Sequence, residues 1–142
     1  MKFILYWGDK AMIDIHSHIL CGVDDGCKTI DDSIILIKEA IKAGVTDLIL
    51  TPHFSYGRLF IKSYNDIESK FRALKIEVLK NNLDINLYLG SEIDENKNIL
   101  NILKHDMCHS LNYTKYVLVD FVTRVTDVDE VCYDLILHGY QP

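Results

Sequence analysis

Short apolar runs alternate along the chain with longer segments in which apolar residues recur every three or four positions. Four runs, at residues 12–16, 47–50, 85–89 and 116–119, predict short buried β-strands. A polar or turn-forming residue closes each run soon after it begins, which is typical of strands that are covered on both faces.

Helical periodicity fills the intervals between these strands. Thr29, with an aspartate three residues later, resembles a capping box and predicts a helix that ends at Gly44. Ser63 is a candidate cap for a second, longer helix, and shorter helices are expected at residues 97–103 and 128–137. Strands that alternate with helices predict an α/β fold with parallel strands and right-handed crossovers.

Composition and charge narrow the class of protein. The 142 residues fit one domain, and 49% hydrophobic with 25% charged residues is the balance of a globular chain. A net charge of -6 argues against nucleic acid or an anionic membrane as the main partner. If an acidic chain of this kind handles phosphate, bound metal cations are the simplest way to offset its own field.

The sequence also predicts the compartment. No apolar run approaches the roughly 18 residues of a membrane span, so no membrane insertion is expected. The apolar segment at residues 1–8 is too short for the core of a signal peptide. The cysteines show no metal-binding or disulfide spacing, which predicts reduced thiols in a cytoplasmic protein. They are Cys21, Cys27, Cys108 and Cys132.

Ionisable side chains follow all four predicted strands. In parallel α/β folds the carboxyl ends of the strands meet, and active sites form there. A single histidine or carboxylate at such a position is usually a cap or a solvated loop residue, but four together favour a metal site. Imidazole mixed with carboxylate suits manganese, iron or zinc, and the number of donors suggests more than one ion. The residues are His16 and His18, His53, Glu92 and Asp120, in chain order.

The remaining histidines and the loop after the first strand complete this inventory. His105, His109 and His138 lie outside the pattern and are interpreted as surface or core residues. The pair Asp24 and Asp25 lies in the loop after the first predicted strand.

Three motifs together resemble the PHP (polymerase and histidinol phosphatase) superfamily. They are IDIHSHI at residues 13–19, VDDG at residues 23–26 and TPH at residues 51–53. The first two motifs, followed by Lys28 and Thr29, are most similar to the manganese-dependent protein tyrosine phosphatases of bacterial capsular and exopolysaccharide synthesis. The resemblance implies a distorted seven-stranded β/α barrel that holds a multinuclear metal cluster, usually of manganese.

The resemblance also implies individual metal ligands. Asp120 aligns with a position where the related phosphatases have glutamate, and it is carried over with the others. Arg58, in the loop after the second strand, is a candidate phosphate contact, although a solvated loop charge is the commoner role of such an arginine. The other matching positions are His16, His18, Asp25, His53 and Glu92.

The match covers residues 12–142 and corresponds to the first four β/α units of the barrel, with residues 1–11 as an N-terminal extension. The histidine, aspartate and arginine positions of the family's later strands have no counterpart here. We therefore expect a partial domain without the C-terminal half of the barrel. Because four strands leave open edges, such a domain is expected to be a truncated product or to complete the barrel as a homo-oligomer.

The predicted function is metal-dependent hydrolysis of a phosphomonoester. By resemblance the substrate is a phosphotyrosine protein, with a cognate tyrosine kinase as partner. No cysteine nucleophile is expected, because the spacing of cysteine and arginine used by cysteine-dependent tyrosine phosphatases is absent. Two alternatives remain open: a catalytically incompetent metal-binding remnant, and a small-molecule phosphoesterase similar to histidinol phosphatase.

Overall fold

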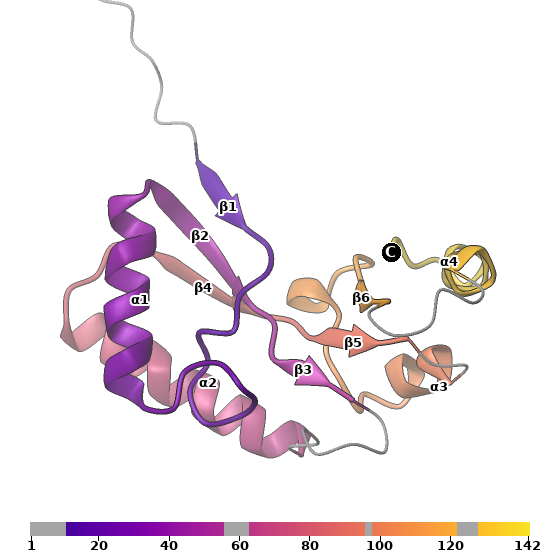
Figure 1. The fold of residues 1–142 in the computed structure, drawn as a ribbon, viewed down its shortest axis with the longest axis horizontal. Coiled ribbons are helices and arrows are strands. Elements are labelled where there is room, and N and C mark those ends of the chain that lie inside the picture. The colour runs from indigo at the N-terminus through magenta and orange to yellow at the C-terminus, as the bar shows by residue number, and fades with distance from the viewer. Residues whose placement is uncertain (1–10, 56–62, 96–97, 122–127) are drawn as a thin grey trace, which may run out of the picture.

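The computed structural model describes residues 11–55, 63–95, 98–121 and 128–142. Its six strands form two parallel sheets of three strands each (Figure 1). The first sheet has the order β1 (Met12–Asp14), β2 (Val45–Leu50), β4 (Asn86–Leu89). The second has the order β3 (His53–Phe54), β5 (Glu92–Asp94), β6 (Leu118–Asp120). The predicted parallel α/β class is confirmed.

The second and third predicted strands end where β2 and β4 end, and each is followed by a short strand that was not predicted. β3 follows β2 after Thr51 and Pro52, and β5 follows β4 after Gly90 and Ser91. The ladder of backbone hydrogen bonds continues across the break. The Gly90 N–H donates to the Leu50 carbonyl at 2.9 Å, and the Glu92 N–H donates to the Pro52 carbonyl at 3.1 Å. β2 with β3 and β4 with β5 therefore form two kinked strands, which lie side by side between β1 and β6.

The predicted strand boundaries at the two ends of the chain were wrong. β1 stops at Asp14 instead of residue 16, and β6 covers residues 118–120 instead of 116–119. His16 N–H donates to the Asp14 carboxylate at 3.1 Å, which turns the chain out of the ladder. Tyr116 makes only an isolated bridge with Gln141.

The helix predictions are confirmed in position. α1 (Ile30–Lys42) begins at a complete capping box on Thr29 and is followed by Gly44 at φ 96°, a conformation that favours glycine. α2 (Tyr64–Lys80) is capped by the Ser63 side chain. α3 (Ile99–Lys104) and α4 (Val128–Leu137) fall where short helices were expected, and a single 3₁₀ turn, η1 (Leu111–Tyr113), precedes β6.

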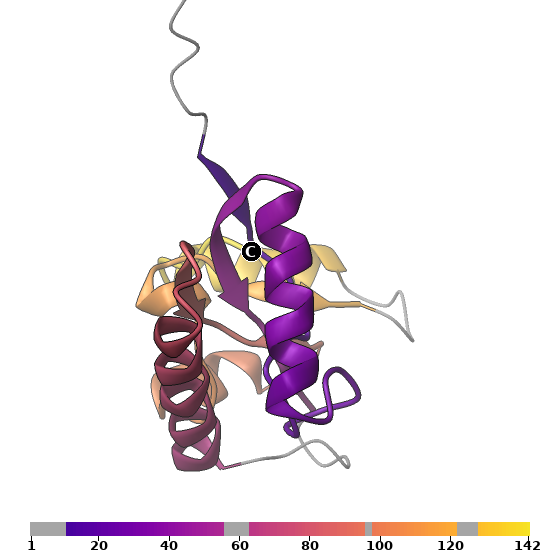
Figure 2. The ribbon, with the colours of Figure 1, turned by 90° about the vertical axis from the view of Figure 1, so that its left-hand side faces the viewer.

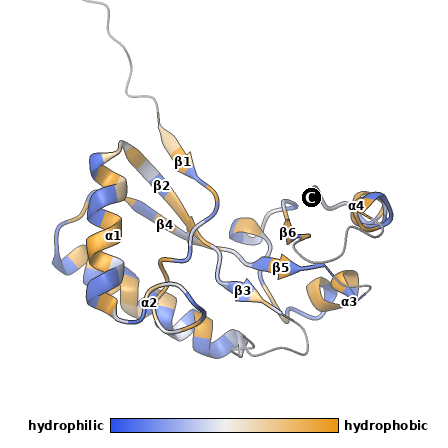
Figure 3. Cartoon of the chain, in the orientation of Figure 1, coloured by the Kyte–Doolittle hydropathy of each residue, from blue (hydrophilic) through white to orange (hydrophobic). Residues whose placement is uncertain are grey.

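Each sheet has its own hydrophobic core. α1 and α2 lie side by side against the first sheet (Figure 2). Hydrophilic and hydrophobic residues are interspersed along both helices (Figure 3). Leu48 and Leu74 are fully buried in this first core. Ile93 and Leu135 are fully buried in the second core, where α3 and α4 pack on the second sheet. Within the described residues, no helix is both long enough and apolar enough to cross a membrane.

Candidate metal centre

The kink between the two sheets brings three histidines onto one carboxylate. His16 Nε2 lies 3.1 Å from Glu92 Oε1, His18 Nε2 lies 3.2 Å from Glu92 Oε2, and His53 Nδ1 lies 3.0 Å from the same Oε2. The two Nε2 atoms of His16 and His18 are 3.2 Å apart. Residues that are far apart in the sequence thus present nitrogen and oxygen atoms to one small volume.

The backbone between His16 and His18 is fixed by reciprocal hydrogen bonds to the end of β2. Ser17 N–H donates to Thr51 Oγ1 at 3.0 Å, and Thr51 N–H donates to the Ser17 carbonyl at 2.9 Å. The Ser17 hydroxyl donates to the Ile49 carbonyl at 2.9 Å. Because Ser17 is buried and turned inward, the histidine on either side of it projects toward Glu92, as alternation along an extended segment requires.

Asp24 holds two of these histidines in place, a role that its sequence motif does not reveal. Its Oδ2 accepts the His18 Nδ1–H at 2.9 Å and the backbone N–H of His53 at 3.1 Å, and its Oδ1 accepts the Gly26 N–H at 3.0 Å. The hydrogen bond on Nδ1 leaves Nε2 of His18 as the ligand atom. The sequence shows only that Asp24 lies two residues before Gly26. The structure is needed to show that Asp24, and not its neighbour Asp25, is the buried aspartate.

Charge in this network is set by burial and hydrogen bonding together. Burial alone would raise the pKa of Asp24, but the hydrogen bonds from His18, Gly26 and His53 outweigh it and hold that pKa below its usual value. The hydrogen bond to Asp24 raises the pKa of His18 despite the opposing effect of burial. Asp24 is therefore a carboxylate at neutral pH.

Asp25 and Asp120 lie at the edges of the same cluster. Asp25 is exposed, and its Oδ1 lies 3.7 Å from His53 Nε2. Asp120 closes β6, the neighbour of β5 that carries Glu92. All six expected ligands belong to three overlapping groups. Within each group, the ligand atoms lie within 4.8 Å of one another. The groups are His16, His18 and Glu92; His18, Asp25 and His53; and His53, Glu92 and Asp120.

The donor set fits a divalent cation. Glu92 Oε2 is buried and makes no hydrogen bond to any described residue, although two imidazole nitrogens lie within 3.2 Å of it. A buried carboxylate oxygen left in this state is costly unless a cation balances it. Overlapping groups that share His18, His53 and Glu92 suit more than one ion. Arg58, the candidate phosphate contact, lies outside the described residues.

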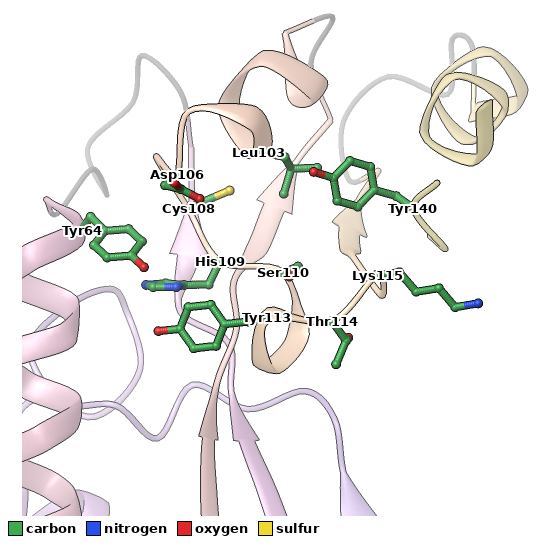
Figure 4. Close-up of a pocket in the computed structure, with 10 residues that line it drawn as sticks. All are labelled: Tyr64, Leu103, Asp106, Cys108, His109, Ser110, Tyr113, Thr114, Lys115 and Tyr140. Atoms are coloured by element: carbon green, nitrogen blue, oxygen red, sulfur yellow. The ribbon is translucent and has the colours of Figure 1, made fainter. Parts of the chain in front are cut away.

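The other histidines lie away from this cluster, as the interpretation required. His109 is buried beside a pocket of about 390 Å³ between the start of α2 and residues 106–115 (Figure 4). Its ring lies 4.2 Å from that of Tyr64 and 5.4 Å from that of Tyr113, measured between centroids. Burial lowers the pKa of His109, so its imidazole is neutral, and this pocket contains none of the three ligand groups.

The two buried thiols, Cys27 and Cys108, are not activated. Burial raises the pKa of Cys108 to about 12, and burial also raises the pKa of Cys27 despite a hydrogen bond with Ser33. A reactive cysteine requires a lowered pKa. The geometry therefore points to the metal cluster, and away from Cys27 and Cys108, as the place where chemistry occurs.

The chain is similar to proteins of one family. Residues 12–142 match the family described as capsular polysaccharide synthesis, CpsB/CapC. The chain is 37% identical over 138 residues to the putative tyrosine-protein phosphatase CapC of Staphylococcus aureus, covering 92% of this chain and 52% of that protein. It is 33% identical over 135 residues to the tyrosine-protein phosphatase YwqE of Bacillus subtilis, again covering 92% of this chain and 52% of the relative.

A solved structure matches as well. It comes from a study of YwqE from Bacillus subtilis and CpsB from Streptococcus pneumoniae, described as unique metal-dependent tyrosine phosphatases. The TM-score is 0.82 at 31% identity, and the match covers 91% of this chain and 53% of the other. The chain thus spans about half the length of the curated relatives and of the solved structure that it matches.

Proposed function

The chain belongs to the CpsB/CapC family of capsular polysaccharide synthesis, and from this we propose that it is a metal-dependent phosphatase of protein phosphotyrosine. The observation that carries the proposal is the contact of His16, His18 and His53 with the two oxygens of Glu92. The names of the matched relatives and the absence of an activated thiol among Cys27 and Cys108 support it.

The proposed ligands are the six residues of the three overlapping groups. Glu92, His18 and His53 each lie in two of them, so these three residues would contribute to holding more than one cation. Manganese is the ion we propose first, and iron or zinc would suit the same donors. When bound, such cations supply Lewis acidity, which activates water and offsets the negative charge of a phosphoryl group.

The chain's own residues prepare this site. Asp24 fixes the orientation of His18 and ties the backbone of His53 to it, so that both imidazoles face Glu92. Thr51 and Ser17 lock the two ligand-bearing segments together. These contacts hold nitrogen and oxygen donors in place for cations, and positioning of this kind accounts for much of the protein's share of phosphoryl-transfer catalysis.

The finer predictions about architecture and context remain proposals. We propose that the kinked strands are consecutive units of a distorted seven-stranded PHP-type barrel. Support comes from their parallel order and from ligands gathered at the kink. Three predictions about context stay predictions: a cognate tyrosine kinase as partner, a cytoplasmic location, and a homo-oligomer that completes the barrel. Two predictions about the chain also stay predictions: its division into residues 1–11 and 12–142, and the incomplete barrel.

The decisive experiment is phosphate release from a phosphotyrosine peptide by the purified chain, with and without manganese. We expect turnover that requires manganese and falls to background in His18→Ala. Histidinol phosphate, offered at the same concentration, should be a poorer substrate, which separates this proposal from a small-molecule phosphoesterase. If folded, metal-loaded protein releases no phosphate from the peptide, the proposal is wrong and the metal-binding remnant is the better description.

A further inference from the structure

An open groove of about 470 Å³ runs from the candidate metal centre along α1. His18 lines one end of it, and residues of α1 line the other. The residue that contacts Glu92 therefore also lines this groove. A molecule bound at the metal centre and a group seated in the groove would be direct neighbours.

The loop between β1 and α1 folds back on itself to form the floor of the groove. Cys27 N–H donates to the His18 carbonyl at 3.1 Å, and Gly22 N–H donates to the Cys27 carbonyl at 2.8 Å. A Cβ atom at Gly26 would lie 2.1 Å from the His18 carbonyl oxygen, so only glycine allows this approach. The His18 side chain remains 28% exposed beside this closely packed loop.

The wall that α1 contributes is apolar where a polar surface is expected. Ile34 and Ile37 point into the first core, whereas Ile35 and Leu36 remain 58% and 46% exposed. Both exposed side chains line the groove. An amphipathic helix normally places polar residues on the face turned away from the core, so an exposed apolar pair beside a candidate active site marks a binding surface.

One cation, Lys28, and one carboxylate, Asp32, line the groove. Lys28 is exposed, and its Nζ donates to the Asp24 carbonyl at 3.2 Å, which holds the ammonium group next to the metal loop. Asp32 also lines the groove, but its carboxylate accepts the Thr29 N–H at 2.9 Å in the capping box of α1. Lys28 therefore offers charge complementarity to an acidic ligand in a chain whose net charge is -6.

We propose that this groove binds the residues that flank the phosphotyrosine of a protein substrate. An apolar side chain of the substrate packs against Ile35 and Leu36, and an acidic side chain pairs with Lys28. The inference rests on the proposed phosphatase function, and it adds a sequence preference to it. Successive residues of an extended peptide are about 3.3 Å apart, so the groove is within reach of the residues next to a phosphotyrosine held at the metal centre.

The test is binding of fluorescein-labelled peptides, in which phosphotyrosine is replaced by its non-hydrolysable difluoromethylphosphonate analogue, to the manganese-loaded chain, measured by fluorescence anisotropy. One peptide has leucine and glutamate flanking the analogue. In two others the leucine is replaced by serine or the glutamate by glutamine. We expect the leucine-to-serine change to weaken binding about tenfold, the lower end of what a hydrophobic pocket discriminates. Replacing glutamate by glutamine should weaken it about threefold, as for an exposed ion pair.

Matched variants assign these preferences to the groove. In Ile35→Ser with Leu36→Ser the leucine preference should fall below about twofold. The control is Ile76→Ser with Leu79→Ser on α2, two residues that are also exposed and lie outside the groove, and it should keep the full preference.

The charge contact has its own pair of variants. Lys28→Gln should abolish the glutamate preference. Lys38→Gln, an exposed lysine further along α1 that does not line the groove, should leave that preference intact.

Hydrolysis of free phosphotyrosine, which has no flanking residues, separates the two proposals. If it is hydrolysed but the wild-type chain shows no leucine or glutamate preference, the groove proposal is wrong and the phosphatase proposal stands. A second outcome is that neither free phosphotyrosine nor a phosphotyrosine peptide is hydrolysed, while the wild-type chain shows the binding preferences and the groove variants do not. The groove then binds as proposed, and the proposed phosphatase function is wrong. If Ile35→Ser with Leu36→Ser changes only the oligomeric state in analytical ultracentrifugation, the groove is an interface between copies and the proposal is overturned.

Discussion

Replacing Asp24 by asparagine should weaken metal binding without unfolding the chain. The carboxylate accepts three hydrogen bonds, two on Oδ2 from His18 and His53 and one on Oδ1 from Gly26. An asparagine side chain has one acceptor oxygen and one donor group in the same space. Whichever way the amide is turned, at least one buried N–H loses its acceptor and faces another donor.

The cheaper orientation keeps the oxygen toward His18 and leaves the Gly26 N–H without an acceptor. A buried donor in that state costs about 1–3 kcal/mol, and the Gly26 N–H, which is only partly buried, should cost about 1 kcal/mol. In this orientation His18 also exchanges a charged acceptor for a neutral one, which loosens control of its tautomer and orientation. Loss of a partner of this kind typically lowers metal affinity by about 10–100-fold, or about 1.4–2.7 kcal/mol, and we expect the same for manganese here.

The assay is isothermal titration of the chelator-treated protein with manganese, together with urea unfolding of the same samples. Asp47→Asn is the matched control, because Asp47 accepts hydrogen bonds from Thr46, Asn86 and Tyr88 near the start of β2, outside the ligand groups. The control should lose stability but keep its manganese affinity. Unchanged manganese affinity in folded Asp24→Asn would refute the assigned role of Asp24.

Three further predictions follow from local features. Thr29→Ala removes the capping box of α1 and should destabilise the chain by about 1 kcal/mol in urea unfolding, whereas Thr29→Ser should cost much less; equal losses would contradict the capping role. Burial lowers the pKa of His109. Below about pH 6.5 this histidine therefore binds a proton more readily in the unfolded chain than in the folded chain. Stability should therefore fall as the pH drops below that value, and His109→Gln should show a shallower dependence in the same unfolding series; an identical slope would show that His109 is not responsible. Cys21→Ser should retain manganese-dependent phosphate release, and loss of activity with metal still bound would contradict a mechanism without a cysteine nucleophile.

Local signals were enough to predict the helices. The caps at Thr29 and Ser63 and the glycine after α1 act within a few residues of their own position, so the sequence displays them directly. The gathering of His16, His18, His53 and Glu92 was also predictable, because parallel strands bring their carboxyl ends together.

Features that depend on distant partners were not predictable in the same way. β3 has only two residues and exists because His53 and Phe54 pair with Glu92 and Ile93 almost forty positions later. Strand propensity cannot identify an element whose stability comes from long-range pairing. The role of Asp24 depends in the same way on its burial beneath His18 and His53, whereas the motif alone drew attention to its exposed neighbour.

The hydrogen bonds between Ser17 and Thr51 have a thermodynamic consequence for cation uptake. They order the backbone around His16, His18 and His53 as part of folding, so little conformational entropy remains to be lost when an ion arrives. Small metal-dependent domains such as zinc fingers gain their structure from the ion itself. Here the heat-capacity change on manganese binding should be close to zero, and a chelated chain should keep its circular dichroism spectrum. Metal would then control catalytic competence without controlling whether the protein is folded.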